Sequence, residues 1–133
     1  EALAMLREEG LERVWRRHAR HGAATRAAVE AWGLEIQCAV AAERSDVVTG
    51  VRVPEGHDAD AVRALILKRY DLALGSGLGK VKGKLFRIGH LGDLNDLMVA
   101  ATLAGVESGL ALAGVPIRRG GVQAAMEMLE AEE

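Results

Sequence analysis

The chain has 133 residues, of which half are hydrophobic and 27% are charged. This length normally forms one compact domain, and this balance is typical of a folded globular protein and excludes a disordered one. The net charge of -2 lacks the cationic excess that sequence-independent nucleic-acid binding requires, so we expect no nucleic-acid partner. The longest apolar stretch, residues 94–115, is interrupted by Asp96, Thr102 and Glu107, and we expect no membrane-spanning segment.

Cys38 is the only cysteine in the sequence, which excludes an intrachain disulfide and a cysteine metal cluster. Because a single cysteine suits a reducing compartment, we expect a cytoplasmic protein. Cys38 itself is predicted to be a small buried residue in a strand and not a nucleophile. The chain starts at Glu1, with neither a methionine nor a signal-peptide pattern, which suggests a fragment of a longer protein.

Two helices are predicted at the N-terminus. Residues 2–9 are helix-prone, and in the segment after Gly10 apolar or small side chains recur at spacings of three and four, which predicts one face of a long helix. Gly10 can bend the chain between the two segments, and Gly33 can end the second helix. Trp15 and Trp32 lie on the apolar stripe and are predicted to be packing residues.

Two strands and a helix are predicted next. Residues 34–42 and 47–53 contain Val and Ile and are separated by a polar segment, so they can pair as antiparallel strands. Asp58 or Asp60 can cap a helix whose apolar residues fall on one face and whose last turn, at residues 68–69, is basic.

The second half of the chain again alternates strands and helices. Short strands at residues 72–74 and 84–88 flank a glycine-rich loop, residues 75–83. A long helix then ends before Gly114, and a last helix covers residues 122–130. Three residues can cap the start of that long helix, namely Asp93, Asn95 and Asp96. We therefore expect an α+β fold in which helices cover a small sheet of about four strands.

The glycine-rich loop and the strand after it have the most unusual composition in the chain. A P-loop is excluded because Leu74 and Val81 stand where it requires glycine and a hydroxyl, and a dinucleotide site is excluded because a strand follows the glycines. Arg87 interrupts an apolar strand beside Gly89, whose lack of a side chain leaves room for a ligand or another backbone to approach. The guanidinium of Arg87 can either bind a carboxylate through two parallel hydrogen bonds or form a structural ion pair at the sheet edge.

Several segments of the chain resemble one enzyme family. Gly-Leu-Gly at 77–79, Gly-Lys at 83–84 and Phe-Arg-Ile-Gly-His-Leu-Gly-Asp at 86–93 resemble the C-terminal motif of the serine-glyoxylate and alanine-glyoxylate aminotransferases, which are class V pyridoxal-phosphate enzymes. Other segments resemble that family in the same order, namely Glu8-Glu9-Gly10-Leu11-Glu12, Trp15-Arg16-Arg17-His18, Val53-Pro54-Glu55-Gly56 and Ala104-Gly105-Val106-Glu107. The resemblance covers essentially the whole chain.

The resemblance implies that residues 1–133 are the C-terminal small domain of a fold-type I enzyme, with residues 1–33 as the long helix that links it to a missing large domain. That large domain would hold pyridoxal 5'-phosphate and its Schiff-base lysine, so we expect no catalytic residue in this chain and no activity from it alone. The family arginine that binds the substrate carboxylate corresponds to Arg87. The implied parent is a homodimer that moves an amino group from L-serine or L-alanine to glyoxylate.

Other residues of this region are weaker candidates. Gly77, Gly79 and His90 are candidate loop contacts of the ligand, although a packed or solvent-facing His90 fits the sequence equally well. The three lysines within residues 80–84 are expected to be solvated, because nothing in an exposed loop would lower the pKa of an amine.

His18 and His21 form a basic stripe with neighbouring arginines on the first long helix. Two histidines three residues apart lack a third ligand, so no metal site is predicted. We expect the stripe to face solvent or another subunit, with Glu9 and Glu12 paired to the arginines four residues further along.

An alternative function from a different class is a stand-alone module that binds an amino acid, or regulates another protein, without catalysis. The absence of a matching Schiff-base lysine favours this alternative, and the family resemblance opposes it. Clear stoichiometric binding of serine or glyoxylate to the isolated chain would support the module.

Overall fold

The computed structural model describes residues 1–131. It begins with the two expected helices, α1 (Ala2–Glu9) and α2 (Leu11–Trp32). Gly10, with a φ of 85°, makes the bend between them, and Gly33 ends α2 in the left-handed conformation with a φ of 79°. Both values favour glycine, since a side chain strains the backbone there.

Four strands form one antiparallel sheet in the order β1-β2-β4-β3. They are β1 (Glu35–Ile36), β2 (Val48–Arg52), β3 (Gly75–Ser76) and β4 (Leu85–Gly89). The two long strands, β2 and β4, lie side by side in the centre, and the two short strands lie at the edges. The expected α+β fold with a small sheet of about four strands is confirmed.

Two predicted strands differ from the structure. The strand expected at 34–42 covers only β1, because the chain leaves β2 after Gln37, whose N–H still bonds the carbonyl of Gly50. A 3₁₀ helix, η1 (Ala41–Glu43), follows, and the predicted site of Cys38 in a strand is wrong, since this half-buried residue lies between β1 and η1. Strand propensity is realised only where a neighbouring strand offers free partners.

The strand expected at 72–74 is also displaced. Pairing with β4 starts only at β3, inside the segment expected to be loop. The carbonyl of Leu74 accepts a hydrogen bond from Nε of Arg63 at 2.8 Å, so a side chain satisfies the backbone just before the strand begins. The loop then contains a second 3₁₀ helix, η2 (Gly79–Val81).

The three remaining helices are α3 (Ala59–Tyr70), α4 (Asp96–Leu112) and α5 (Gly121–Glu130). Asp58 caps α3 and Asn95 caps α4, each by accepting a hydrogen bond at 2.9 Å from a backbone N–H of the first turn. No helix among residues 1–131 is long and apolar enough to cross a membrane.

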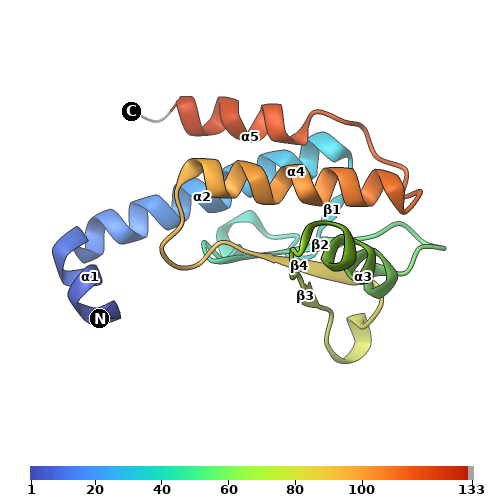
Figure 1. The fold of residues 1–133 in the computed structure, drawn as a ribbon, viewed down its shortest axis with the longest axis horizontal. Helices are drawn as coiled ribbons and strands as arrows, with labels where there is room; N and C mark the ends of the chain where they lie inside the picture. The colour runs from blue at the N-terminus through green and yellow to red at the C-terminus, as the bar shows by residue number, and fades with distance from the viewer. Residues whose placement is uncertain (132–133) are drawn as a thin grey trace.

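Apart from α1, which projects to one side, the α-helices pack over one face of the sheet, and α2, α4 and α5 contact one another (Figure 1). Within the described residues the opposite face of the sheet carries no α-helix (Figure 1). The core lies between the helices and the covered face, and its largest fully buried side chains include Trp32, Phe86, Ile66, Ile88, Leu103 and Leu110. The fold therefore leaves one sheet face available to a ligand or to another part of a protein.

Candidate functional site

Arg87 projects from the centre of the sheet on its uncovered face. Its neighbours in β4, Phe86 and Ile88, are buried beneath the helices, and successive side chains of a strand point to opposite faces. In the sheet register Arg87 stands opposite Gly50 on one side and opposite Gly75 on the other. Both cross-strand neighbours therefore lack a side chain that could cover the guanidinium.

The guanidinium of Arg87 is held at one nitrogen only. Its Nε donates a hydrogen bond to the carbonyl of Ser76 at 2.9 Å. Its two terminal nitrogens, Nη1 and Nη2, form no hydrogen bond or ion pair with any residue from 1 to 131. The structural ion pair considered for Arg87 is absent from this part of the chain. The two free terminal NH₂ groups of an arginine can bind the two oxygens of a carboxylate through parallel hydrogen bonds.

Gly77 and Gly79 shape the turn between β3 and β4. A Cβ atom at Gly77 would lie 2.2 Å from the carbonyl oxygen of Val81, and the Gly77 N–H donates to the carbonyl of Leu85 at 3.2 Å. Gly79 has a φ of 53°, in the left-handed region that favours glycine. Turn geometry accounts for both glycines, and their contact with a ligand stays a prediction.

His90 is buried at the end of β4 and does not lie on the open face. Its Nδ1 donates to the carbonyl of Asp46 at 3.0 Å, so its Nε2 is the acceptor for the hydroxyl of Thr49, also at 3.0 Å. Burial lowers the pKa of His90 to about 4, and the imidazole is therefore neutral at pH 7. Of the two interpretations of His90 considered above, the structure agrees with a packed histidine that fixes the end of β4.

The lysines of the chain all lie at the surface, namely Lys68, Lys80, Lys82 and Lys84. This confirms the exposure expected for the loop lysines. An exposed amine is solvated and lacks the enclosed site that a Schiff-base lysine requires.

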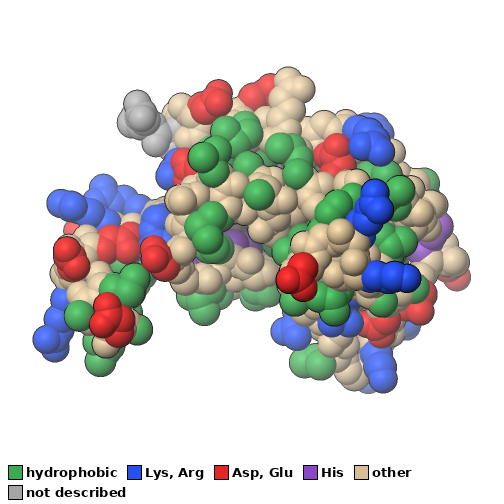
Figure 2. Space-filling model, viewed as in Figure 1, with side chains coloured by type: hydrophobic (Ala, Val, Ile, Leu, Met, Phe, Trp, Pro, Cys, Tyr) green, Lys and Arg blue, Asp and Glu red, His purple; other side chains and the backbone are tan. Residues whose placement is uncertain are grey.

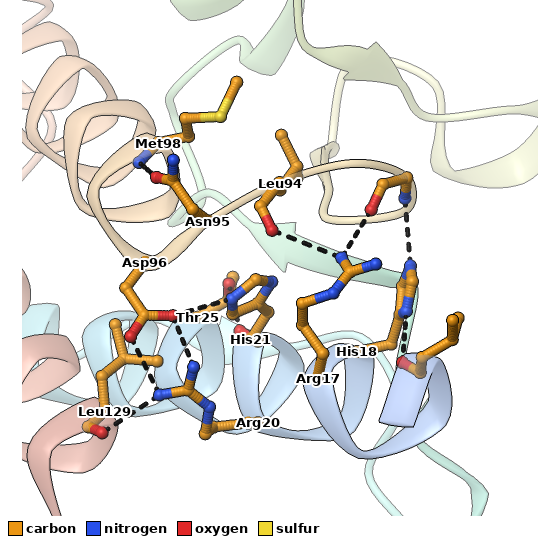
Figure 3. Close-up of polar contacts among 12 residues, drawn as sticks. Arg17, His18, Arg20, His21, Thr25, Leu94, Asn95, Asp96, Met98 and Leu129 are labelled. Carbon is orange, nitrogen blue, oxygen red and sulfur yellow. Dashed lines mark hydrogen bonds and ion pairs between the residues drawn. The ribbon is translucent and has the colours of Figure 1, made fainter. Parts of the chain in front are cut away.

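Side chains of α2 form a polar network with the first turn of α4 and with the loop that joins β4 to α4, and this network was not predicted from the sequence (Figure 3). Arg20 forms two hydrogen bonds with the carboxylate of Asp96, at 2.7 and 2.9 Å, and Nε2 of His21 lies 3.0 Å from the same carboxylate. Burial lowers the pKa of His21, although Asp96 opposes this effect. These partners are 75 or more residues apart in the sequence, so no local pattern could pair them.

Arg17 and His18 hold the same loop one turn earlier on α2 (Figure 3). Arg17 Nη1 donates to the carbonyl of Gly92 at 2.7 Å, and the Gly92 N–H donates to Nε2 of His18 at 3.0 Å. Arg17 also pairs with Glu9 at 2.7 Å, so the prediction that Glu9 pairs four residues further along is wrong. His18 and His21 are buried, so the expectation that the stripe faces solvent or a subunit is wrong for the two histidines, whereas Arg13 and Arg16 of the stripe are exposed.

The two tryptophans of α2 differ in their exposure to solvent. Trp32 is 1% exposed and packs in the core as predicted, whereas Trp15 is 64% exposed, so its prediction as a packing residue is wrong. Trp15 belongs to the N-terminal part of α2, which extends beyond the sheet towards α1 (Figure 1), and within residues 1–131 no second layer covers this side chain. None of the residues that the structure describes form a group of three or more potential metal ligands.

The sequence of this chain is similar to those of known aminotransferases. No family model matches the chain. It is 53% identical over 131 residues to a serine–glyoxylate aminotransferase from Methylorubrum extorquens, a match that covers 97% of this chain and 32% of the relative. It is 52% identical over 121 residues to an L-aspartate–glyoxylate aminotransferase from Paracoccus denitrificans, with 90% of this chain and 30% of the relative covered.

The solved structures that share this fold are also named as aminotransferases. Pyridoxamine–pyruvate aminotransferase from Mesorhizobium loti matches 98% of this chain with a TM-score of 0.92 and 36% identity, over 34% of its own length. Ureidoglycine–glyoxylate aminotransferase from Bacillus subtilis matches 96% of the chain with a TM-score of 0.89 and 34% identity, over 33% of its own length. This chain is homologous to one part of the glyoxylate aminotransferases. It spans about a third of the length of these relatives.

Proposed function

We propose that this chain is the C-terminal, carboxylate-binding part of a class V aminotransferase that uses pyridoxal 5'-phosphate. The parent enzyme moves an amino group from L-serine or L-alanine to glyoxylate, and Arg87 binds the carboxylate of each substrate. The residue pattern 86–93, the similarity to glyoxylate aminotransferases and the geometry of Arg87 all support this proposal.

The observation that carries the proposal is the guanidinium of Arg87 on the uncovered sheet face. Its Nη1 and Nη2 are free of partners within the described chain, while its Nε is already held by the backbone of Ser76. An arginine prepared in this way can present two parallel N–H groups to one carboxylate. Every substrate of the proposed reaction carries a carboxylate next to the reacting carbon, so a single clamp serves both the amino donor and glyoxylate.

The residues of this chain do not provide the site of pyridoxal 5'-phosphate. A Schiff-base lysine needs an enclosed site that lowers the pKa of its amine, and the chain's lysines are all exposed. We therefore assign the cofactor and its lysine to the remainder of the parent protein, where the cofactor would supply the electronic part of the reaction. The isolated chain is expected to have no transaminase activity.

The contribution of this chain to the reaction is orientation. A carboxylate held at two points cannot rotate freely, so the amine or carbonyl beside it is directed to one place. Arg87 does not need to exchange a proton for this role, because its guanidinium remains charged throughout. We propose in addition that the parent is a cytoplasmic homodimer, for which the family resemblance and the single cysteine are the grounds.

The proposal is tested with the full-length protein that contains this chain. Purified enzyme with glyoxylate should convert L-serine or L-alanine, and L-aspartate serves as the third donor because one relative is named for it. The isolated chain, mixed with pyridoxal phosphate and reduced with borohydride, should yield no single stoichiometric pyridoxyl-lysine. Transaminase turnover by the isolated chain would contradict the assignment of the cofactor site to another domain.

A further inference from the structure

The side chain of Arg87 lies across Gly75 on the neighbouring strand. A Cβ atom built on Gly75 would stand 3.1 Å from Cβ and 3.1 Å from Nε of Arg87, and 3.4 Å from its Cζ. Contacts of 3.1 Å are tighter than carbon atoms normally make, so a methyl group here would displace the arginine. The arginine therefore occupies the space that a side chain at position 75 would fill.

The backbone at Gly75 does not itself require glycine. Gly75 is not among the glycines with a positive φ, so any residue could adopt its conformation. What the position requires is space above the strand, and the three atoms nearest to a Cβ built there all belong to the side chain of Arg87. The absence of a side chain at position 75 is thus linked to the placement of one residue.

The next residue completes the support. The carbonyl of Ser76 accepts the hydrogen bond from Nε of Arg87 at 2.9 Å. Gly75 and Ser76 together form the whole of β3, which pairs with β4 at Arg87 and Phe86. One short edge strand thus gives the guanidinium both a surface to lie on and a hydrogen bond that fixes its direction.

We propose that Gly75 is a positioning residue for the recognition of the substrate carboxylate. This inference rests on the proposed function of Arg87. Gly75 touches no substrate; it leaves the guanidinium in the orientation in which Nε bonds Ser76 and both terminal nitrogens stay free. A methyl group at position 75 turns the guanidinium away from that orientation and weakens carboxylate binding, with little effect on the fold.

The test compares Gly75→Ala with Gly105→Ala in the full-length enzyme. Gly105 lies in α4, away from the uncovered sheet face, also lacks a positive φ, and a Cβ there would meet the end of the Leu72 side chain at 3.0 Å and the edge of the Tyr70 ring at 4.0 Å. Gly75→Ala should lower kcat/KM for L-serine and for glyoxylate by about fivefold or more, mainly through KM, while Gly105→Ala stays within about twofold. Thermal unfolding and cofactor absorbance should match between the two variants.

A double-mutant cycle with Arg87→Ala separates positioning from a general structural effect. If Gly75 acts through Arg87, Gly75→Ala should change kcat/KM by no more than about twofold in the Arg87→Ala background. An equal loss in both backgrounds, or a Gly75→Ala enzyme with wild-type kcat/KM, overturns the inference while the role of Arg87 stands. If Arg87→Ala is itself without effect, the proposed function fails, and this inference fails with it.

A second readout does not depend on activity. In the ¹⁵N NMR spectrum of the 133-residue chain, the Nε–H signal of Arg87 reports its hydrogen bond to Ser76. Gly75→Ala should shift that signal or speed its exchange with water, and Gly105→Ala should not. An unchanged Arg87 signal in Gly75→Ala contradicts the proposed displacement.

Discussion

His90 is a buried, neutral histidine three residues after Arg87, and its titration is linked to stability. In the unfolded chain a histidine has a pKa near 6.5, whereas in the fold burial lowers the pKa of His90 to about 4. Between these values the unfolded state binds more protons, so the free energy of unfolding falls as the pH is lowered. The stability is fully present above pH 6.5 and is lost towards pH 4.

We predict that His90 makes unfolding strongly pH-dependent. Its contribution should be a loss of about 3 kcal/mol between pH 7 and pH 4, from 1.36 kcal/mol per pKa unit. Urea denaturation at several pH values should therefore give a shallower pH dependence for His90→Gln than for the wild type. Ile66→Val, which removes one buried methyl group and no titrating group, is the control and should keep the wild-type slope. Equal slopes for His90→Gln and wild type would contradict the prediction.

The carboxylate of Glu107 in α4 links three helices. It accepts hydrogen bonds from Nε1 of Trp32 at 2.7 Å and from the N–H of Gly121 at 2.8 Å, so α4 holds the end of α2 and the start of α5. Burial alone would raise the pKa of Glu107, but these hydrogen bonds outweigh burial and lower it. The carboxylate therefore remains charged and acts as the cap that α5 does not supply from its own sequence.

Removal of this carboxylate should loosen α5. Glu107→Ala leaves the indole N–H of Trp32 and the N-terminal amides of α5 without their partner, and we predict a loss of about 2–4 kcal/mol in the free energy of unfolding. Glu127→Ala is the matched control, because Glu127 is exposed and bonds only Gln123 in its own helix; its effect should stay below about 0.5 kcal/mol. Similar midpoints for the two variants in urea would count against the link.

Gly109 lies in the middle of α4, where helix propensity favours alanine over glycine by about 0.5–1 kcal/mol. A Cβ atom there would stand 2.1 Å from Cγ1 of Ile66, since α3 and α4 approach closely at this point. We therefore predict that Gly109→Ala destabilises the protein by about 1–3 kcal/mol, opposite in sign to the propensity. A Cβ at Gly105 would meet the end of the Leu72 side chain at 3.0 Å and the edge of the Tyr70 ring at 4.0 Å, so Gly105→Ala should be close to neutral. A stabilised Gly109→Ala variant in thermal unfolding would contradict the close approach.

The sequence predicted the long helices well and the short strands poorly. The helices α2 and α4 have long runs in which apolar residues and caps agree, so their existence and ends follow from local physics. The strands β1 and β3 are two residues long, and their positions depend on which atoms of β2 and β4 remain unpaired. Pairing of this kind is a property of the sheet and cannot be seen in one segment.

In the candidate site, too, some residues were predicted from the sequence and others were not. Arg87 was predicted because a charged residue in an apolar strand is visible in the sequence and because its motif resembles a known family. The role of Gly75 and the bond between Arg20 and Asp96 were not predicted, since each depends on two segments that meet only in the fold. His18 and His21 were recognised as part of a basic stripe, but their partners, Gly92 in the loop before α4 and Asp96 in the first turn of α4, could not be deduced.

At the scale of the whole molecule, α1 and the beginning of α2 project from the body, with hydrophobic side chains between charged ones (Figure 2). Leu11 and Trp15, one turn apart on α2, are 54% and 64% exposed, whereas Val14 and Trp32 of the same helix are buried. An exposed apolar surface promotes association once it exceeds a few hundred square ångströms.

We predict that the isolated chain self-associates through this surface. Sedimentation at rising concentration should show dimers or larger species for the wild type, and Trp15→Ser should shift the distribution towards the monomer. Val40→Ser, which removes a 53% exposed side chain elsewhere on the molecule, is the control and should leave association unchanged. An ideal wild-type monomer at high concentration would count against the prediction.

Whether Arg87 binds the substrate carboxylate is tested by Arg87→Ala and Arg87→Lys in the full-length enzyme. Arg87→Ala should lower kcat/KM for both L-serine and glyoxylate by about thirtyfold or more, which corresponds to at least about 2 kcal/mol, with cofactor absorbance unchanged. Arg87→Lys keeps the charge but not the paired N–H groups, so it should recover only part of the loss. An amine without a carboxylate should react equally with all three enzymes. If Arg87→Ala instead keeps kcat/KM for both substrates within about threefold, an effect below about 1 kcal/mol, Arg87 is not the carboxylate clamp.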